Sequence, residues 1–280
     1  MNDPGLNDAI WQVAMHAAKA GGSVIVKTFP ETPVATSDQL GIGARSKGDK
    51  SYDLVSETDE EAERRIVAVI KENFPDHAIL AEEGHRATVD AEHLWVVDPL
   101  DGTNNFLHGI PHCAVSIAYR FQGETKLGIV FNPMTDDWYQ ARKGDGATLN
   151  GKSLQVSSAK TLDEILVGVG FYYDRGAMME STLSAISALF RQQVHGIRRL
   201  GTASLDLCWV AAGRYGAYFE YELSAWDFAA GELIVTEAGG KVTDARGDVL
   251  ACARGSVFAS APGVQEAALE LVRHHHPKCE

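Results

Sequence analysis

The chain has 280 residues and a formal net charge of −13 at pH 7, with 45% hydrophobic and 22% charged residues. This length exceeds the ~150 residues of a typical domain, so one large globule and two fused subdomains are both possible. The acid excess disfavours a surface for nucleic acid or an anionic membrane, because those partners need clustered Lys and Arg. No apolar run approaches the ~20 residues of a membrane span, and the first residues lack a signal-peptide pattern. We therefore expect a cytoplasmic protein with no nucleic-acid or membrane partner.

The positions of the cysteines bear on whether a zinc ion or disulfides stabilise the fold. The chain has four of them, at Cys113, Cys208, Cys252 and Cys279, and no two form a CxxC pair. Such scattered positions argue against a structural zinc site and against a disulfide framework. Reduced thiols are expected.

The N-terminal third alternates between helical and loop patterns. Apolar residues recur at helical spacing from 6 to 27, which predicts an amphipathic helix. Residues 29–50 are rich in Pro, Gly and polar side chains and predict a long loop, for which a lid and a mobile decoration both remain open. Thr58 and Glu61 form a capping-box pattern for a following helix, with Asp59 in its first turn. The helix dipole alone could account for that acid.

The stretch from 94 to 106 organises the rest of the chain. An apolar strand ends at Asp98 and Asp101, and Pro99 and Gly102 predict a turn that brings the two carboxylates together. Carboxylates this close repel each other, and either a shared proton or a bound cation can relieve the repulsion. A second apolar strand candidate, 77–81, ends at Glu82.

The remaining elements alternate strands and helices. A meander of three strands is predicted at 114–119, 127–131 and 138–141, and a further strand at 165–170. Helices are predicted at 182–190, 202–212, 227–238 and 264–273, with strands at 215–221 and 256–260. Glu220 and Asp227 mark a third place where a strand leads into acidic residues.

The acidic residues point to a hard metal ion. Glu82, Asp98, Asp101 and Asp227 offer only oxygen donors, without Cys or His close by in the sequence. This donor set favours Mg²⁺, Ca²⁺ or Mn²⁺ over zinc or copper, and the Leu100 carbonyl could add a ligand.

An anion site is predicted directly after the two aspartates. Gly102 and Thr103 begin a possible short helix whose free N–H groups point at an anion. No GxxxxGK[ST] motif occurs, so a small phosphate ester is favoured over a nucleotide in a P-loop. Attack by a metal-activated water is then the simplest chemistry.

These motifs together resemble one family. The stretches 53–59, 82–83, 95–106, 150–151, 198–203 and 226–240 follow the order found in the inositol monophosphatase family of Mg²⁺-dependent, typically lithium-sensitive phosphatases. The resemblance covers nearly the whole chain. It implies an α/β fold, a layered αβαβα sandwich of the sugar-phosphatase type, and a homodimer. Residues 1–153 would carry most metal ligands and residues 154–280 would supply Asp227 and substrate contacts, in one compact catalytic unit.

The resemblance also implies a role for each motif residue. Glu82, Asp98 and the Leu100 carbonyl would bind one Mg²⁺, and Asp98, Asp101 and Asp227 a second, with Mn²⁺ as a possible substitute. A third, weaker ion would use Glu82. Thr103 and Asp59 would position the attacking water. The Gly102 and Thr103 amides would hold the phosphate, and inositol hydroxyls would be contacted by Asp101, Ala203 and Glu220. Lys47 and Lys50 both fit a family lysine, so neither is assigned a role.

The favoured function is hydrolysis of an inositol monophosphate. Histidinol phosphate, fructose 1,6-bisphosphate and adenosine 3′,5′-bisphosphate are the alternative substrates, because pocket shape and not the metal site selects the alcohol. A different class of function is a regulatory protein that binds a protein or RNA partner on the same fold. The complete set of acids and the lack of a basic patch favour the enzyme.

Overall fold

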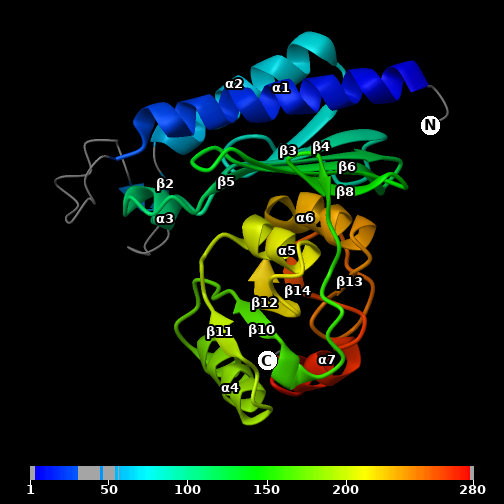
Figure 1. Cartoon of the computed structure of the whole chain (residues 1–280). Helices are drawn as coiled ribbons and strands as arrows, with labels where there is room; N and C mark the ends of the chain where they lie inside the picture. The colour runs from blue at the N-terminus through cyan, green and yellow to red at the C-terminus, as the bar shows by residue number, and fades with distance from the viewer. Residues whose placement is uncertain (1–3, 31–44, 47–53, 56, 278–280) are drawn as a thin grey trace.

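Helices and sheets alternate in five layers in the computed structural model, which describes residues 4–30, 45–46, 54–55 and 57–277. In Figure 1, α1 and α2 cover the outer face of a large sheet, and α5 and α6 lie between that sheet and a smaller one. Helices α4 and α7 cover the far face of the smaller sheet. The predicted layered αβαβα fold is therefore confirmed.

The described helices have these bounds: α1 Pro4–Thr28, α2 Glu57–Asn73, α3 Thr103–Leu107, α4 Ala177–Arg191, α5 Ala203–Ala211, α6 Ala225–Glu237, α7 Gln265–His274, and the 3₁₀ turn Leu162–Glu164. The strands of the large sheet are β3 Ala78–Ala81, β4 His93–Asp101, β5 Ala114–Phe121, β6 Glu124–Asn132, β7 Asp137–Arg142, β8 Gly146–Leu149 and β9 Lys152–Ser153. The strands of the smaller sheet are β10 Leu166–Val169, β11 Gly196–Arg198, β12 Ala217–Leu223, β13 Lys241–Thr243 and β14 Gly255–Ser260, and β1 Arg45–Ser46 pairs with β2 Leu54–Val55.

The large sheet is a meander with one parallel edge. Its strands follow chain order from β3 to β9, and all neighbours are antiparallel except β3 and β4. Both faces are apolar: on β4, Trp95 and Val97 pack toward α1 and α2, whereas Leu94 and Val96 pack toward α5 and α6. A strand buried on both faces reads as a continuous apolar run, which explains the pattern that precedes Asp98.

The smaller sheet has the order β11-β10-β12-β14-β13, with β10 parallel to both of its neighbours. Helix α6 is buried on nearly every side because it lies between the two sheets. It approaches β6 so closely that a Cβ added at Gly128 would lie 2.6 Å from the Ala230 carbonyl oxygen. The helix is thereby fixed against the large sheet, and Asp227 in its first turn is fixed with it.

Three local predictions are corrected. Helix α2 begins at Glu57, so Thr58 lies inside its first turn and not at the cap. Strand β4 continues through Pro99 to Asp101, with an irregular register to β5 at this end, where a turn was expected. The strands β9, β11 and β13 were not predicted, because two or three residues carry too little periodicity, and the four-residue strand β8 was not predicted either.

Two sets of predictions are not tested by the fold. The loop 31–44 and the lysines Lys47 and Lys50 lie outside the described residues. The division at residues 153 and 154 falls at the end of β9, and the assignment of separate roles to 1–153 and 154–280 stays a prediction. None of the described helices has the length and apolar character needed to cross a membrane.

Candidate active site

A β-bulge places the two central aspartates side by side at the end of β4. Asp98 pairs with Ser116 of β5 and Asp101 pairs with Ala114, so β4 has one extra residue between the two pairs. Pro99 has no N–H for the ladder, and the Leu100 N–H donates to Oδ1 of Asp98 at 3.0 Å. The bulge therefore turns both carboxylates to the same cavity and stabilises one of them.

Gly102 makes the sharp entry into α3. Its φ is 90°, a left-handed conformation that strains most L-residues, and an added Cβ would lie 2.4 Å from Oγ1 of Thr202. Both the backbone angle and the close approach require glycine here. A short helix was predicted to begin with Gly102 and Thr103, and α3 begins at Thr103 with Gly102 as its cap residue.

Thr103 links α3 to α2. Its hydroxyl donates to Oδ1 of Asp59 at 2.7 Å and also lies 3.1 Å from the Leu100 carbonyl oxygen. Asp59 is fully buried behind Thr103 in the first turn of α2. When the hydroxyl hydrogen points to Asp59, the oxygen lone pairs of Thr103 face the cavity and can accept a hydrogen bond from a water.

Two helix starts in the C-terminal half hold Asp101 and Asp227 in place. Asp101 Oδ2 accepts hydrogen bonds from the N–H of Ser204 at 2.7 Å and from its hydroxyl at 2.6 Å, at the beginning of α5. Asp227 Oδ2 accepts from the Ser224 N–H at 2.6 Å in the capping box of α6. Helix starts provide N–H donors without partners, so both carboxylates are oriented by backbone groups.

All but one of the predicted site residues line a single cavity of about 210 Å³. Asp59 is the exception: it does not line the cavity but accepts the hydrogen bond of Thr103, which does. The predicted residues on the cavity wall are Glu82, Asp98, Leu100, Asp101, Gly102, Thr103, Ala203, Glu220 and Asp227. Their functional roles stay predictions. The sequence interpretation gave no role to four further residues of the same cavity wall, Arg199, Asp206, Tyr172 and Arg254. Arg199 lies in the stretch 198–203 that carries the resemblance, whereas the other three lie outside all of the stretches that carry it.

Burial and mutual repulsion raise the pKa of the central acids. Loss of water raises the pKa of Asp98 well above its ordinary value, and the nearby Glu82, Asp101 and Asp227 raise it further. The pKa of Asp101 rises to about 6, because burial outweighs the hydrogen bonds from Ser204. The pKa of Asp227 is also raised well above normal, mainly by burial. A positive charge in the cavity would offset this cost of burying negative charge.

A second acidic group lies on the wall supplied by the smaller sheet. Burial raises the pKa of Glu220 to about 7, although the hydroxyl of Tyr218 donates to its Oε2 at 2.8 Å. Gly170 provides the room for this side chain, because an added Cβ would lie 1.7 Å from Glu220 Oε2. Asp206 is buried beside it, and burial raises its pKa well above normal. This wall is suited to hydrogen bonds with hydroxyl groups.

The donors fit a hard cation in kind. They are carboxylate and carbonyl oxygens in one buried cavity, the ligands that Mg²⁺ and Mn²⁺ prefer. Among the described His, Cys, Asp and Glu side chains, no three converge as a ready-made metal cage. The fit therefore rests on donor chemistry and on the raised pKa values of Asp98 and Asp227, not on a preformed coordination geometry.

The sequence matches the inositol monophosphatase family over residues 6–277. The chain belongs to the inositol monophosphatase family. It is 42% identical over 240 residues to the protein named Nus factor SuhB of Pseudomonas aeruginosa, a match that covers 84% of this chain and 85% of the relative.

Solved structures of the inositol monophosphatase family have the same fold. An IMPase of Thermotoga maritima superposes with a TM-score of 0.83 at 30% identity, over 96% of this chain and 98% of that one. SaIMPase-II of Staphylococcus aureus with inositol monophosphate bound superposes with a TM-score of 0.77 at 26% identity, over 96% and 95%.

The expectation that nucleic acid is not among the partners is wrong. The Pseudomonas relative, which matches most of this chain, is named Nus factor SuhB, the name of a factor that acts with the transcription machinery and nucleic acid. The expectation rested on the net charge of −13, which is a sum over the whole chain. Such a sum does not exclude a partner that binds one local surface or that is reached through another protein.

Proposed function

We propose that this protein hydrolyses small phosphate monoesters in a Mg²⁺-dependent reaction, with an inositol monophosphate as the favoured substrate. The observation that supports the proposal most is the shared cavity, where four acids, the Gly102 and Thr103 turn and the wall with Glu220 meet. Membership of the inositol monophosphatase family supports the reaction class, and the inositol monophosphate bound to SaIMPase-II supports the substrate.

Each group has a proposed task. Glu82, Asp98, Asp101, Asp227 and the Leu100 carbonyl would hold two or three Mg²⁺ ions, with Mn²⁺ as a substitute. Such ions offset phosphate charge and lower the pKa of a water. Thr103, oriented by Asp59, accepts a hydrogen bond from the attacking water and thereby directs its lone pair to phosphorus.

The protein also binds both ends of the substrate. The first N–H groups of α3, at Gly102 and Thr103, would hold the phosphate oxygens. Asp101, Ala203 and Glu220 would contact the hydroxyl groups of the leaving alcohol. Lithium sensitivity and a homodimer stay predictions of the family resemblance, and a cytoplasmic location stays a prediction from the sequence pattern.

A phosphate-release panel tests this proposal. It compares inositol 1-phosphate, fructose 1,6-bisphosphate, histidinol phosphate and adenosine 3′,5′-bisphosphate across Mg²⁺ and Li⁺ titrations. We expect Mg²⁺-dependent turnover that is fastest with inositol 1-phosphate and is absent in the Asp98→Asn variant. An Asp98→Asn protein with wild-type turnover would contradict the mechanism, and faster turnover of another ester would change the substrate assignment.

A second function is favoured by the name of the Pseudomonas relative, Nus factor SuhB. We propose that this chain also acts as a factor with a transcription partner. Affinity purification of the tagged protein should recover transcription proteins in stoichiometric amounts, and the Asp98→Asn variant should recover them equally well, because that residue is buried in the cavity. Recovery of the chain alone would argue against this second role.

A further inference from the structure

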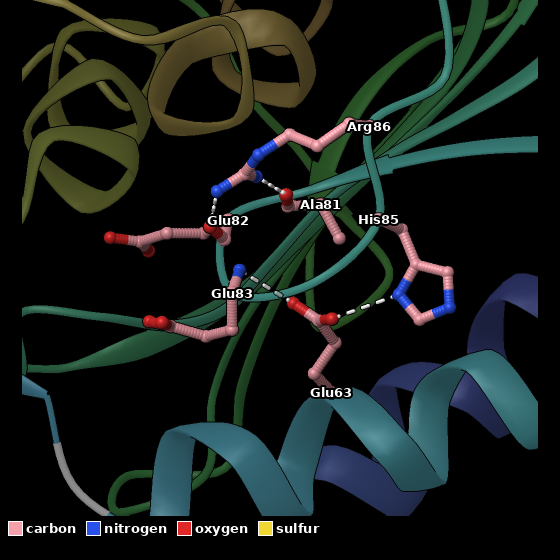
Figure 2. Close-up of polar contacts among 6 residues, drawn as sticks. All are labelled: Glu63, Ala81, Glu82, Glu83, His85 and Arg86. Atoms are coloured by element: carbon pink, nitrogen blue, oxygen red, sulfur yellow. Dashed lines mark hydrogen bonds and ion pairs between the residues drawn. The ribbon is translucent and has the colours of Figure 1, made fainter.

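The turn that follows β3 is held by a buried carboxylate from another element. Figure 2 shows Glu63 of α2 between the two ends of this turn. The Glu83 N–H donates to Glu63 Oε2 at 2.8 Å, and Nδ1 of His85 lies 2.9 Å from Glu63 Oε1. The Glu63 side chain is only 5% exposed. One carboxylate therefore fixes the backbone directly after Glu82 and the side chain two residues further on.

Arg86 holds the same turn from the other side. Its guanidinium donates to the carbonyl oxygen of Ala81 and, at 2.8 Å, to that of Glu82. The guanidinium carbon also lies 5.4 Å from the centroid of the Trp226 ring, next to Asp227. The peptide groups on both sides of Glu82 are thus bound by side chains from outside β3.

Helix α2 presents two buried acids to this end of the large sheet. Asp59 and Glu63 are four residues apart, so they lie on the same face of the helix. Asp59 binds the Thr103 hydroxyl, and Glu63 binds the Glu82 turn. The helix dipole explains an acid in the first turn but not one further along, as Glu63 is. The cost of burying the Glu63 carboxylate is offset by its contacts with the Glu83 N–H and with His85 Nδ1.

We propose that Glu63 is a positioning residue that sets the affinity of the cavity for its divalent ions by fixing the direction of Glu82. This inference rests on the metal assignment under the proposed function. A bound Glu83 amide restricts the backbone of the turn, so Glu82 loses less freedom when it binds an ion. Groups that orient metal ligands typically change metal affinity by about 10- to 100-fold when they are removed.

The chemistry of the two contacts predicts which substitutions preserve the effect. In Glu63→Gln, the amide oxygen still accepts from the Glu83 N–H, and the amide nitrogen can donate to His85 Nδ1. In Glu63→Ala, both contacts disappear and the Glu83 N–H is left without this acceptor. In His85→Ala, the Glu83 contact remains but the carboxylate is held at one oxygen only.

The test is a titration of each protein with Mn²⁺ alone, without substrate, in which electron paramagnetic resonance measures free Mn²⁺. Glu63→Ala should weaken Mn²⁺ binding about 10- to 100-fold. Glu63→Gln should keep most of the wild-type affinity, and His85→Ala should fall between them. The matched control is Glu61→Ala on the same helix, since Glu61 forms ion pairs with Arg64 and Arg65 of α2. Its affinity should equal that of the wild type.

The outcomes separate this inference from the proposed function. A wild-type protein that binds no Mn²⁺ would remove the metal assignment, and the role of Glu63 with it. A wild-type protein that binds Mn²⁺, together with equal affinity in a folded Glu63→Ala protein, would overturn the inference alone. If circular dichroism shows that Glu63→Ala does not fold, His85→Ala decides, because its side chain is 42% exposed and its loss is tolerable. Unchanged Mn²⁺ affinity in His85→Ala would then overturn the inference.

Discussion

The Thr103 hydroxyl donates a hydrogen bond to Asp59 at 2.7 Å across 44 residues of chain, and this contact joins α3 to α2. If the pair orients the attacking water, Thr103→Ala and Asp59→Ala should each lower kcat about 100-fold or more with little change in KM. The double variant should lose no more than the more damaging single variant, because the residues act as a unit. Steady-state phosphate release measures both.

Thr103→Ser is the matched control for this pair. Serine keeps the hydroxyl that donates the hydrogen bond to Asp59, so most activity should remain. Fully additive losses in the double variant would mean that the two residues act independently.

Asp98→Asn should remove activity and stabilise the metal-free protein. Burial and three neighbouring acids raise the pKa of Asp98 in the folded state. A raised folded pKa means that the stability of this group is complete at low pH and is lost as the pH rises. Asparagine has no such cost, so at pH 8 in a chelator the variant should be more stable than the wild type.

Thermal denaturation at several pH values checks this prediction. The difference between the variant and the wild type should shrink as the pH falls. Added Mg²⁺ should raise the Tm of the wild type and leave that of the variant unchanged. A variant that is less stable than the wild type at pH 8 without metal would contradict the assignment of Asp98 as a strained acid.

Gly170→Ala should impair recognition of the alcohol and leave phosphate chemistry intact. The added Cβ would overlap Glu220, whose Oε2 lies 1.7 Å from that position, and would push its carboxyl out of place. A hydrogen bond to a charged group contributes about 1.5–3 kcal/mol, so kcat/KM for inositol 1-phosphate should fall about 10-fold or more. The rate with para-nitrophenyl phosphate, which has no hydroxyl groups to recognise, should change little.

Gly255→Ala is the control for the smaller sheet, since no atom lies within 4 Å of its added Cβ. It should behave as the wild type with both substrates. If Gly170→Ala loses activity equally with both substrates, the substitution has distorted the site in general and has not removed a contact with the alcohol alone.

The part of the site that was predictable is the part that is contiguous in sequence. Asp98, Asp101, Gly102 and Thr103 lie within six residues, and the constraints on Pro99 and Gly102 are local. The layered fold followed from the family resemblance, and the apolar run 94–97 indicated a strand, which the structure shows to be buried on both faces.

The rest depends on tertiary contacts. The bond from Ser204 to Asp101 spans 103 residues, and no local pattern marks Ser204 as its partner. Glu63 is an intermediate case: its four-residue spacing from Asp59 puts both acids on one helix face, but that pattern is equally typical of a solvated face. Only the turn after β3 shows that this acid is buried.

His77 should make the protein less stable as the pH falls, independently of the cavity. Burial and the neighbouring His93 and Lys71 lower the pKa of His77 to about 4, while Asp76 opposes the shift. The Trp95 Nε1–H donates a hydrogen bond to His77 Nδ1 at 3.1 Å. The His77 ring also stacks on the His93 ring, with 4.3 Å between the ring centroids. The folded protein therefore favours the neutral ring.

The direction in which stability changes with pH follows from that preference. The unfolded chain takes up a proton near pH 6.5, whereas the folded protein does so only near pH 4, so stability falls as the pH drops through this window. His77→Gln keeps an acceptor for Trp95 and removes the titration, so the decline of Tm between pH 6.5 and 4 should be shallower than in the wild type. His195→Gln, which replaces an exposed histidine, should keep the wild-type slope. Parallel slopes for the wild type and His77→Gln would show that the stacked histidines do not govern acid stability.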